Sequence, residues 1–118
     1  DKKALTDKPE KFFASEMIRE KVLQTYSKEI PYSVEIEIEE FKEELEIIRI
    51  RAIIYVARNS QKGIVIGHQG ESLKKVGTEA RKDLEEFFQK KVYLDLFVKV
   101  NKDWRTDESK LKRFGYLS

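Results

Sequence analysis

Two glycines three residues apart, Gly67 and Gly70, interrupt an otherwise helical pattern over residues 60–76. The pattern predicts a short helix, a turn over residues 67–70 and a second helix. Because glycine has no Cβ, the main chain of such a turn can pass close to a bulky ligand. The second helix begins directly after the turn, so its free N–H groups and the positive end of its dipole point toward the same ligand. This arrangement suits the sugar-phosphate backbone of a nucleic acid.

The composition is that of one globular domain, because hydrophobic residues make up 40% and charged residues 39% of the 118 residues. The absence of cysteine excludes disulfides and thiolate metal sites, and it fits a reducing cytoplasm. No apolar run approaches the ~20 residues that a membrane span needs, and no signal-peptide pattern opens the chain. We therefore expect a cytoplasmic protein.

The charge is distributed unevenly along the chain, although the net charge is only +2. Residues 1–57 hold 10 basic and 13 acidic side chains, a net charge of −3, and residues 58–118 hold 14 basic and 9 acidic side chains, a net charge of +5. The basic half contains the glycine turn. Such an asymmetry is the expected footprint of a polyanionic partner, and an ordinary mixed-charge surface is the alternative.

The hydrophobic pattern predicts a three-stranded sheet. Residues 34–39 alternate apolar and acidic side chains, which is typical of a strand with one buried and one solvated face. Residues 46–58 are apolar on both faces in their second half and predict the central strand. Residues 92–100 alternate again after the second helix, and they predict a third strand parallel to the second. The expected fold class is α+β in the order αββααβ, with a mixed sheet, helices on one face and a short C-terminal helix.

The expected organisation is a linker remnant at residues 1–6, one folded domain at residues 7–101, and a C-terminal tail with a short helix at residues 102–118. The first helix should begin at Asp7, where Asp-Lys-Pro-Glu supplies a capping acid and a first-turn proline. Ser60 is expected to cap the short helix before the glycine turn. The apolar stripe of the first helix consists of Ala14, Ile18, Val22 and Tyr26.

The register of the first two strands can also be predicted. If their connection centres on residue 43, Glu37 opposes Arg49 and Glu35 opposes Arg51 on the solvated face, where opposite charges favour this pairing. The acids of this segment lie along one strand face and do not converge, so no metal site is expected.

The predicted element order and the frame Val65-Ile-Gly-His-Gln-Gly-Glu-Ser-Leu-Lys-Lys-Val76 together resemble a type II KH domain. A lone G-x-x-G is common by chance, whereas the frame V-I-G-x-x-G-x-x-[IL]-K-x-[IV] between the expected strands is specific. Further stretches are similar to the C-terminal domain of the Era family of bacterial GTPases, and the likeness runs from Thr6 to Tyr116. They include Glu29-Ile-Pro-Tyr-Ser-Val34, Ser60-Gln-Lys-Gly63, Gly77-Thr-Glu-Ala-Arg-Lys-Asp83, Asp103-Trp-Arg105 and Phe114-Gly-Tyr116.

The resemblance implies a larger protein that binds GTP and assists assembly of the 30S ribosomal subunit. It implies that this domain grips single-stranded RNA near the 3′ end of the small-subunit ribosomal RNA. This chain has no G-x-x-x-x-G-K-[ST] phosphate loop, so GTP and Mg are expected in an N-terminal GTPase domain outside it, and no cofactor is expected here. The resemblance also implies peripheral association with the inner membrane, although no helix has the pattern of a basic amphipathic anchor.

The expected RNA-binding residues are the turn, the apolar residues beside it and nearby basic residues. They are Arg58, Lys62, Ile64, Val65, Ile66, Gly67, His68, Gln69, Gly70, Leu73, Lys74, Lys75 and Val76. His68 and Gln69 stand where KH turns often carry a lysine or arginine, so the lysines outside the turn must supply more of the phosphate attraction. The second strand is expected to read base edges. The alternatives are core packing for Ile66, Leu73 and Val76, and a solvated helix face for Lys74 and Lys75.

Other roles for the chain were weighed on the residues alone. His68 is the only histidine and has no nucleophile or paired acid near it in sequence, so no catalytic residue is expected. Trp104 is expected to pin the tail to the domain, with base stacking as the alternative. Gly77 lies on the apolar stripe of the second helix, where close contact with the sheet would explain a glycine. The rival function is a protein-docking module that contacts the GTPase domain or ribosomal proteins through its acidic strand face.

Overall fold

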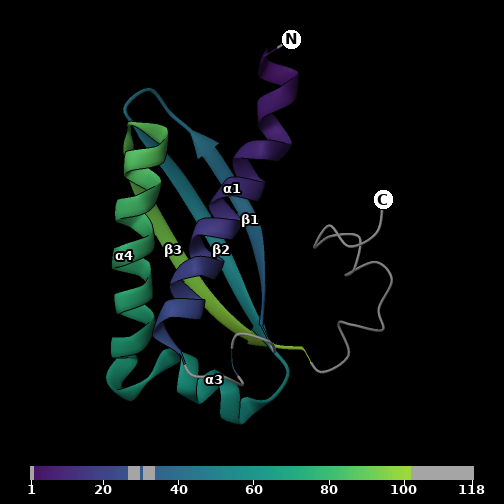
Figure 1. The fold of residues 1–118 in the computed structure, drawn as a ribbon, viewed down its shortest axis with the longest axis vertical. Coiled ribbons are helices and arrows are strands. Elements are labelled where there is room, and N and C mark those ends of the chain that lie inside the picture. The colour runs from purple at the N-terminus through teal and green to yellow at the C-terminus, as the bar shows by residue number, and fades with distance from the viewer. Residues whose placement is uncertain (1, 27–29, 31–33, 102–118) are drawn as a thin grey trace.

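The computed structural model describes residues 2–26, 30 and 34–101, and for residues 2–8 it describes the backbone alone. Their order is the predicted αββααβ, with one further short turn of helix between the last two helices (Figure 1). The elements are α1 (Lys2–Thr25), β1 (Glu35–Glu43), β2 (Ile47–Val56), α3 (Asn59–Ile66), η1 (His68–Gly70), α4 (Glu71–Phe88) and β3 (Lys91–Val100).

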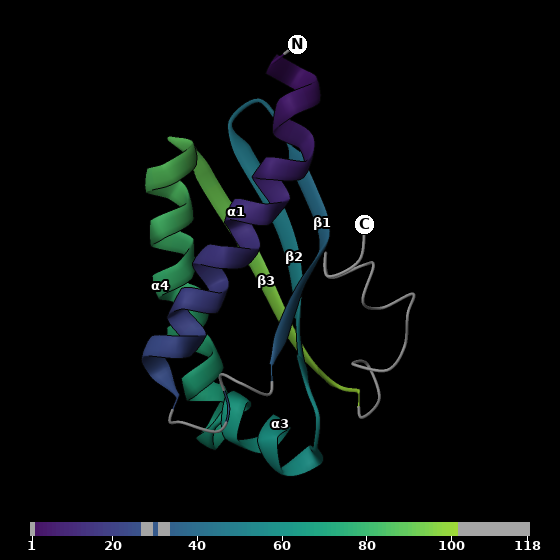
Figure 2. The same ribbon diagram turned by 45° about the vertical axis from the view of Figure 1, so that its right-hand side comes forward.

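The three strands form one sheet in the order β1-β2-β3, so the prediction of a central second strand is confirmed. β1 runs antiparallel to β2, and β3 runs parallel to β2, which makes the sheet mixed. The long helices α1 and α4 lie side by side on one face of the sheet, and α3 lies across one end of it (Figures 1 and 2). The strand β3 is therefore an edge strand that runs beside α4.

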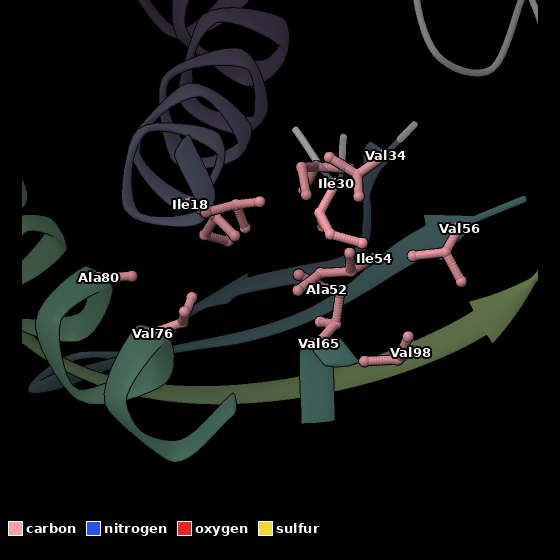
Figure 3. Close-up of a cluster of buried hydrophobic side chains, with 12 residues drawn as sticks. Ile18, Ile30, Val34, Ala52, Ile54, Val56, Val65, Val76, Ala80 and Val98 are labelled. Carbon is pink, nitrogen blue, oxygen red and sulfur yellow. The ribbon is translucent and has the colours of Figure 1, made fainter. Parts of the chain in front are cut away.

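The hydrophobic core fills the space between the helices and the sheet (Figure 3). The stripe predicted on α1 is confirmed, because Ala14, Ile18 and Val22 are fully buried. Tyr26 packs against the cluster that holds Ile18 and Val22, and Ala14 belongs to a second cluster. β2 contributes residues from its helix-facing side, such as Ala52 and Ile54, because alternate side chains of a strand point to the same face. The apolar faces that the period-two and period-3.6 patterns predict thus pack against each other in two clusters between the helices and the sheet.

The predicted pairing of β1 with β2 is wrong. Lys42 lies opposite Arg49 and Glu40 lies opposite Arg51, with an irregularity in the register between Ile38 and Glu40. β1 continues to Glu43, so the connection is later and tighter than predicted. The later connection accounts for the error, because it moves the partner of Glu37 four positions along β2, from Arg49 to Ile53. The bulge changes the pairing beyond it by one residue only.

The acidic face of β1 is also less solvated than predicted. Glu35 is only 3% exposed and forms an ion pair with Arg19 of α1. Glu37 accepts a hydrogen bond of 2.9 Å from the hydroxyl of Tyr55. These carboxylates tie β1 to its neighbours inside the domain, because burial of an unpaired carboxylate would be costly.

The helix α1 begins at Lys2, so the predicted start at Asp7 is wrong, and Pro9 lies inside the helix. Proline favours the first turn, but a helix can pass through it at the cost of one backbone hydrogen bond. The predictions for the C-terminal helix and for Trp104 lie outside the described residues.

Candidate nucleic-acid interface

The first part of the candidate site is α3, which leads from β2 into the glycine turn. The side-chain oxygen of Gln61 accepts hydrogen bonds of 3.0 Å from the backbone N–H groups of both Ala57 and Arg58. The prediction of Ser60 as the cap is wrong, because α3 begins at Asn59 and Ser60 already lies inside it. Gln61 instead closes the start of α3 from inside the helix, because it binds the N–H groups of the N-cap residue Arg58 and of Ala57 before it.

The turn over residues 67–70 adopts backbone angles that explain its glycines. Gly67 has φ 79° and ψ 177°, a region that is essentially restricted to glycine, and Gly70 has φ 76° in the left-handed region. A Cβ on Gly67 would lie 2.3 Å from the hydroxyl oxygen of Ser72, whereas a Cβ on Gly70 would meet nothing within 4 Å. At Gly67 both the backbone angles and the contact with Ser72 exclude a side chain. At Gly70 only the backbone angles disfavour one.

The exposed side of the turn faces solvent at the start of α4. His68 and Gln69 are both exposed, and Gln69 has φ 54°, which is uncommon for a residue with a side chain. The cap position of α4 is Gly70, which has no side chain to accept hydrogen bonds from the first N–H groups of the helix. The N–H groups of Gly70 and Glu71 are already bonded within the turn, to the carbonyl oxygens of Gly67 and His68. The positive end of the helix dipole is therefore the feature that favours an anion at this end of α4.

A cavity of about 360 Å³ opens beside the turn, between α4 and the edge strand β3. Its lining combines an apolar floor from both elements with basic side chains on α4. The lining residues are Gly70, Leu73, Lys74, Gly77, Thr78, Arg81, Leu94 and Leu96. A site that joins a backbone anion site to an apolar floor can hold an elongated ligand with charged links and flat apolar groups.

The strand at this cavity is not the one that we predicted. β2 is the central strand and contributes no lining residue, whereas β3 contributes Leu94 and Leu96. These two residues, together with Gly77, Thr78 and Arg81, are not among the residues predicted from the sequence. The signal was present, because a parallel crossover places the third strand beside the helix that precedes it, and alternation turns Leu94 and Leu96 toward that helix.

The predicted site residues separate into three groups. Gly70, Leu73 and Lys74 line the cavity. Val65 and Val76 are fully buried in the core (Figure 3), and Ile66 packs against it. Core packing is the alternative that we weighed for Ile66 and Val76, and Val65, for which we had not weighed it, is buried in the same way. The exposed or half-exposed residues around the turn are Arg58, Lys62, Ile64, Gly67, His68, Gln69 and Lys75.

Gly77 does not serve the close packing that we predicted. A Cβ at this position would lie 3.5 Å from Leu96 Cδ1, which is ordinary van der Waals contact. The sheet would therefore accept an alanine. The position lines the cavity, so the missing side chain leaves room for a ligand there.

Two polar contacts connect α1 and the residue directly after it to the helices α3 and α4 on either side of the turn. The hydroxyl of Tyr26 donates a hydrogen bond to the carbonyl oxygen of Val65, and burial raises the pKa of Tyr26 to about 12. The ammonium of Lys21 lies 2.8 Å from a carboxylate oxygen of Asp83 on α4. This hydrogen bond raises the pKa of Lys21. α1 thus fixes both helices that flank the glycine turn.

Two absences hold for the described part of the chain. It contains no cluster of three or more histidine, aspartate or glutamate side chains that could hold a metal ion. No helix within it is long and apolar enough to cross a membrane.

Comparison with known proteins places this geometry in a family. Residues 29–105 match the family model described as KH domain. GTPase Era of Coxiella burnetii (strain Dugway 5J108-111) is 51% identical over 112 residues, and GTPase Era of Geotalea uraniireducens (strain Rf4) is 50% identical over 113 residues. Each alignment covers 95% of this chain and 38% of the relative, so the chain spans well under half of their length.

Solved structures show the same relationship. Aquifex aeolicus Era bound to GDP and AlF4⁻ superposes with a TM-score of 0.84 and 37% sequence identity, over 90% of this chain and 36% of that one. A structure of Era in complex with MgGDPNP and nucleotides 1506–1542 of 16S ribosomal RNA matches with the same score, identity and coverage. The chain belongs to the KH domain family, and it is a C-terminal KH domain of the Era type.

Proposed function

We propose that this domain binds single-stranded RNA in the cavity between α4 and β3, with the RNA backbone held by the glycine turn. The backbone N–H groups of His68 and Gln69 contact phosphates, and the positive end of the α4 dipole attracts them. Bases lie on the apolar floor made by Leu73, Leu94 and Leu96. Basic side chains attract the phosphates of the same strand; they are Arg58, Lys62, Lys74, Lys75 and Arg81.

One observation carries this proposal: the cavity opens directly at Gly70, where α4 begins and the positive end of its dipole lies. A phosphate at the turn and a base on the leucine floor can therefore belong to neighbouring nucleotides. We extend the proposal to the 3′ region of small-subunit ribosomal RNA and to 30S assembly. The support is the likeness to an Era structure that contains 16S ribosomal RNA nucleotides.

The GTP-dependent part of this function would reside outside the chain. GTP and Mg would bind to a GTPase domain of the parent protein, which would be a further partner of this domain. The names of the relatives support that proposal.

The test is RNA binding by a variant with negative charge in the turn. In His68→Asp with Gln69→Asp, two carboxylates face the phosphates while both glycines remain, so affinity for single-stranded RNA should fall at least tenfold by fluorescence anisotropy. The matched control is Leu45→Asp with Gln89→Asp, which adds the same charge at exposed positions, in the connection between β1 and β2 and directly after α4. Both segments lie at the end of the sheet opposite α3 (Figure 1). Unchanged affinity in a folded turn variant would eliminate the turn as the contact.

Salt dependence separates this function from protein docking. An RNA-binding groove loses affinity steeply as salt rises, because counterions are released on binding. A domain that only docks protein has no RNA affinity to lose. The acidic docking surface is also reduced here, because Glu35 is buried against Arg19 and Glu37 is engaged by Tyr55.

A further inference from the structure

The edge strand β3 has a second side that the proposed groove does not use. Leu94 and Leu96 point toward α4, so the residues between and beyond them point to the opposite face of the sheet. We call that opposite face, over β2 and β3, the far face. On it, Tyr93 is 52% exposed and Phe97 is 43% exposed. Both rings present much of their area to solvent on the same side of one strand, so they can contact a ligand that lies along it.

Each ring on the far face is accompanied by an arginine from β2. The guanidinium carbon of Arg49 lies 5.8 Å from the centre of the Tyr93 ring, and that of Arg51 lies 5.9 Å from the centre of the Phe97 ring. Both distances are near the outer limit of about 6 Å for a cation–π contact. The arginines are therefore close enough to reach a ligand on the rings and too far to occupy the ring faces tightly.

The charge on the far face changes from one edge to the other. Acids toward β1 engage the arginines: Glu44 lies 3.1 Å from Arg49, and Glu39 lies 3.6 Å from Arg51. Along β3 the acid is Asp95, partly exposed between the rings, while Lys91 and Lys99 are exposed at the two ends. An anionic ligand is therefore favoured along β3 and disfavoured toward β1.

The far face is continuous with the candidate RNA groove. Leu94 and Leu96 line the groove from one side of β3, and Tyr93 and Phe97 stand on the other side of the same strand. β3 is an edge strand, so only its own width separates the two surfaces. A chain that leaves the groove can pass over this edge without crossing any other described element.

We infer that Tyr93 and Phe97, with Arg49 and Arg51, form a second contact surface for the same single-stranded RNA beyond the groove. The inference rests on the proposed function and extends it. Exposed aromatics on a sheet stack bases of single-stranded RNA, and arginine contacts either the base plane or the phosphate. The two rings are about 13 Å apart along the strand. That is several times the ~3.4 Å step between stacked bases, so each ring receives a different, splayed base.

The test compares two RNA lengths with the 118-residue chain. A short oligonucleotide of about four nucleotides fills the groove alone, and one of roughly twelve nucleotides also reaches the far face. Wild type should bind the long RNA more tightly. Tyr93→Ala with Phe97→Ala should weaken the long RNA about tenfold or more, given what base–aromatic stacking contributes, and leave the short RNA unchanged.

Three further variants make the result specific. Tyr93→Leu with Phe97→Leu keeps apolar bulk on the strand without a π-face, and it should weaken the long RNA as the alanines do. Tyr93→Phe with Phe97→Tyr keeps both rings and should bind like wild type. Phe12→Ala with Phe87→Ala removes two other half-exposed rings, which lie on α1 and α4, and should leave both RNAs unaffected.

The outcomes separate this inference from the proposed function. If the short RNA binds and the ring variants leave the affinity for the long RNA unchanged, the inference of RNA contact at the far face is overturned and the proposed RNA groove stands. If the long RNA binds in a way that depends on the two rings and the short RNA does not bind, RNA contact at the far face is supported and the proposed RNA groove is overturned. Binding of neither RNA would overturn both.

Discussion

The hydroxyl of Tyr26, directly after α1, donates a hydrogen bond to the carbonyl oxygen of Val65, one residue before the end of α3. A carbonyl in the last turn of a helix has no partner within that helix. Tyr26 supplies the partner from 39 residues away in sequence, just ahead of the glycine turn. The position of the turn thus depends on a contact with α1.

Removal of the Tyr26 hydroxyl should lower the stability of the domain without leaving a cavity in the core. Tyr26→Phe keeps the ring and loses the hydrogen bond, so the free energy of unfolding should fall by about 1 kcal/mol. Urea denaturation measures the change. Tyr93→Phe is the control, because that tyrosine is half exposed and its hydroxyl can bond to water, so its stability should match wild type within error.

Tyr26 should also give the domain a specific sensitivity to alkaline pH. Its pKa in the folded protein is about 12, above the usual value of 10.0, because burial disfavours the phenolate. Below pH 10 both states bind the proton and the stability is complete. Between pH 10 and 12 the unfolded state releases its proton first, so the stability falls as pH rises.

The comparison of wild type with Tyr26→Phe isolates this titration from that of Lys21, whose raised pKa causes a loss at high pH in both proteins. Wild-type stability should decline more steeply than that of the variant over this pH range. Equal slopes would contradict a raised pKa at Tyr26.

The two glycines of the turn should respond differently to alanine. Gly67→Ala places a Cβ against Ser72 in a glycine-only backbone region, so it should lower the free energy of unfolding by about 2 kcal/mol or more. Gly70→Ala meets open space and should cost about 1 kcal/mol, for its left-handed angles alone. Thermal denaturation of both variants checks the order, and a larger loss at Gly70 would contradict the geometry of the turn.

Gly77→Ala should separate stability from binding. Alanine in place of a helical glycine gains about 1 kcal/mol of helix propensity, and the methyl group fits against Leu96. The same methyl group enters the cavity, so RNA affinity should fall while the melting temperature rises. Gly63→Ala is the matched control, because it lies in α3 with nothing within 4 Å of its Cβ and away from the cavity lining. Higher stability with unchanged RNA affinity would remove Gly77 from the binding surface.

The basic residues at the cavity should set part of its salt dependence. Lys74→Gln and Arg81→Gln should each weaken RNA binding and reduce the slope of log affinity against log salt by about 1. Lys82→Gln is the control that removes the same charge at a different position, because Lys82 is exposed on α4 but does not line the cavity. Equal effects at all three positions would indicate a diffuse charge effect in place of a groove.

The sequence predicted the parts of the fold that depend on local periodicity. The central strand, the helical stripe of α1 and the glycine turn each follow from a repeating pattern within a few residues. The register of β1 did not follow, because the alternation of side chains does not fix where the connection lies, and it lies at residues 44–46, beyond the predicted centre at residue 43. The burial of Glu35 depends on Arg19, which lies in another element, and no local pattern encodes that contact.

The candidate site was predictable at the turn and less so at the cavity. Gly70, Leu73 and Lys74 were named from the motif, and they line the cavity. The contribution of β3 required knowledge of which strand forms the edge. Val65 and Val76 were predicted to line the groove, but their side chains are buried. The sequence alone does not distinguish an apolar residue that packs in the core from one that contacts a ligand.

The most direct measurement is the change of backbone amide NMR shifts as single-stranded RNA is added to the labelled chain. If the turn holds the RNA backbone, the largest changes should fall on the amides of residues 67–73, followed by Leu94 and Leu96 across the cavity. Changes centred on the amides of β1, with the turn unaffected, would contradict the account.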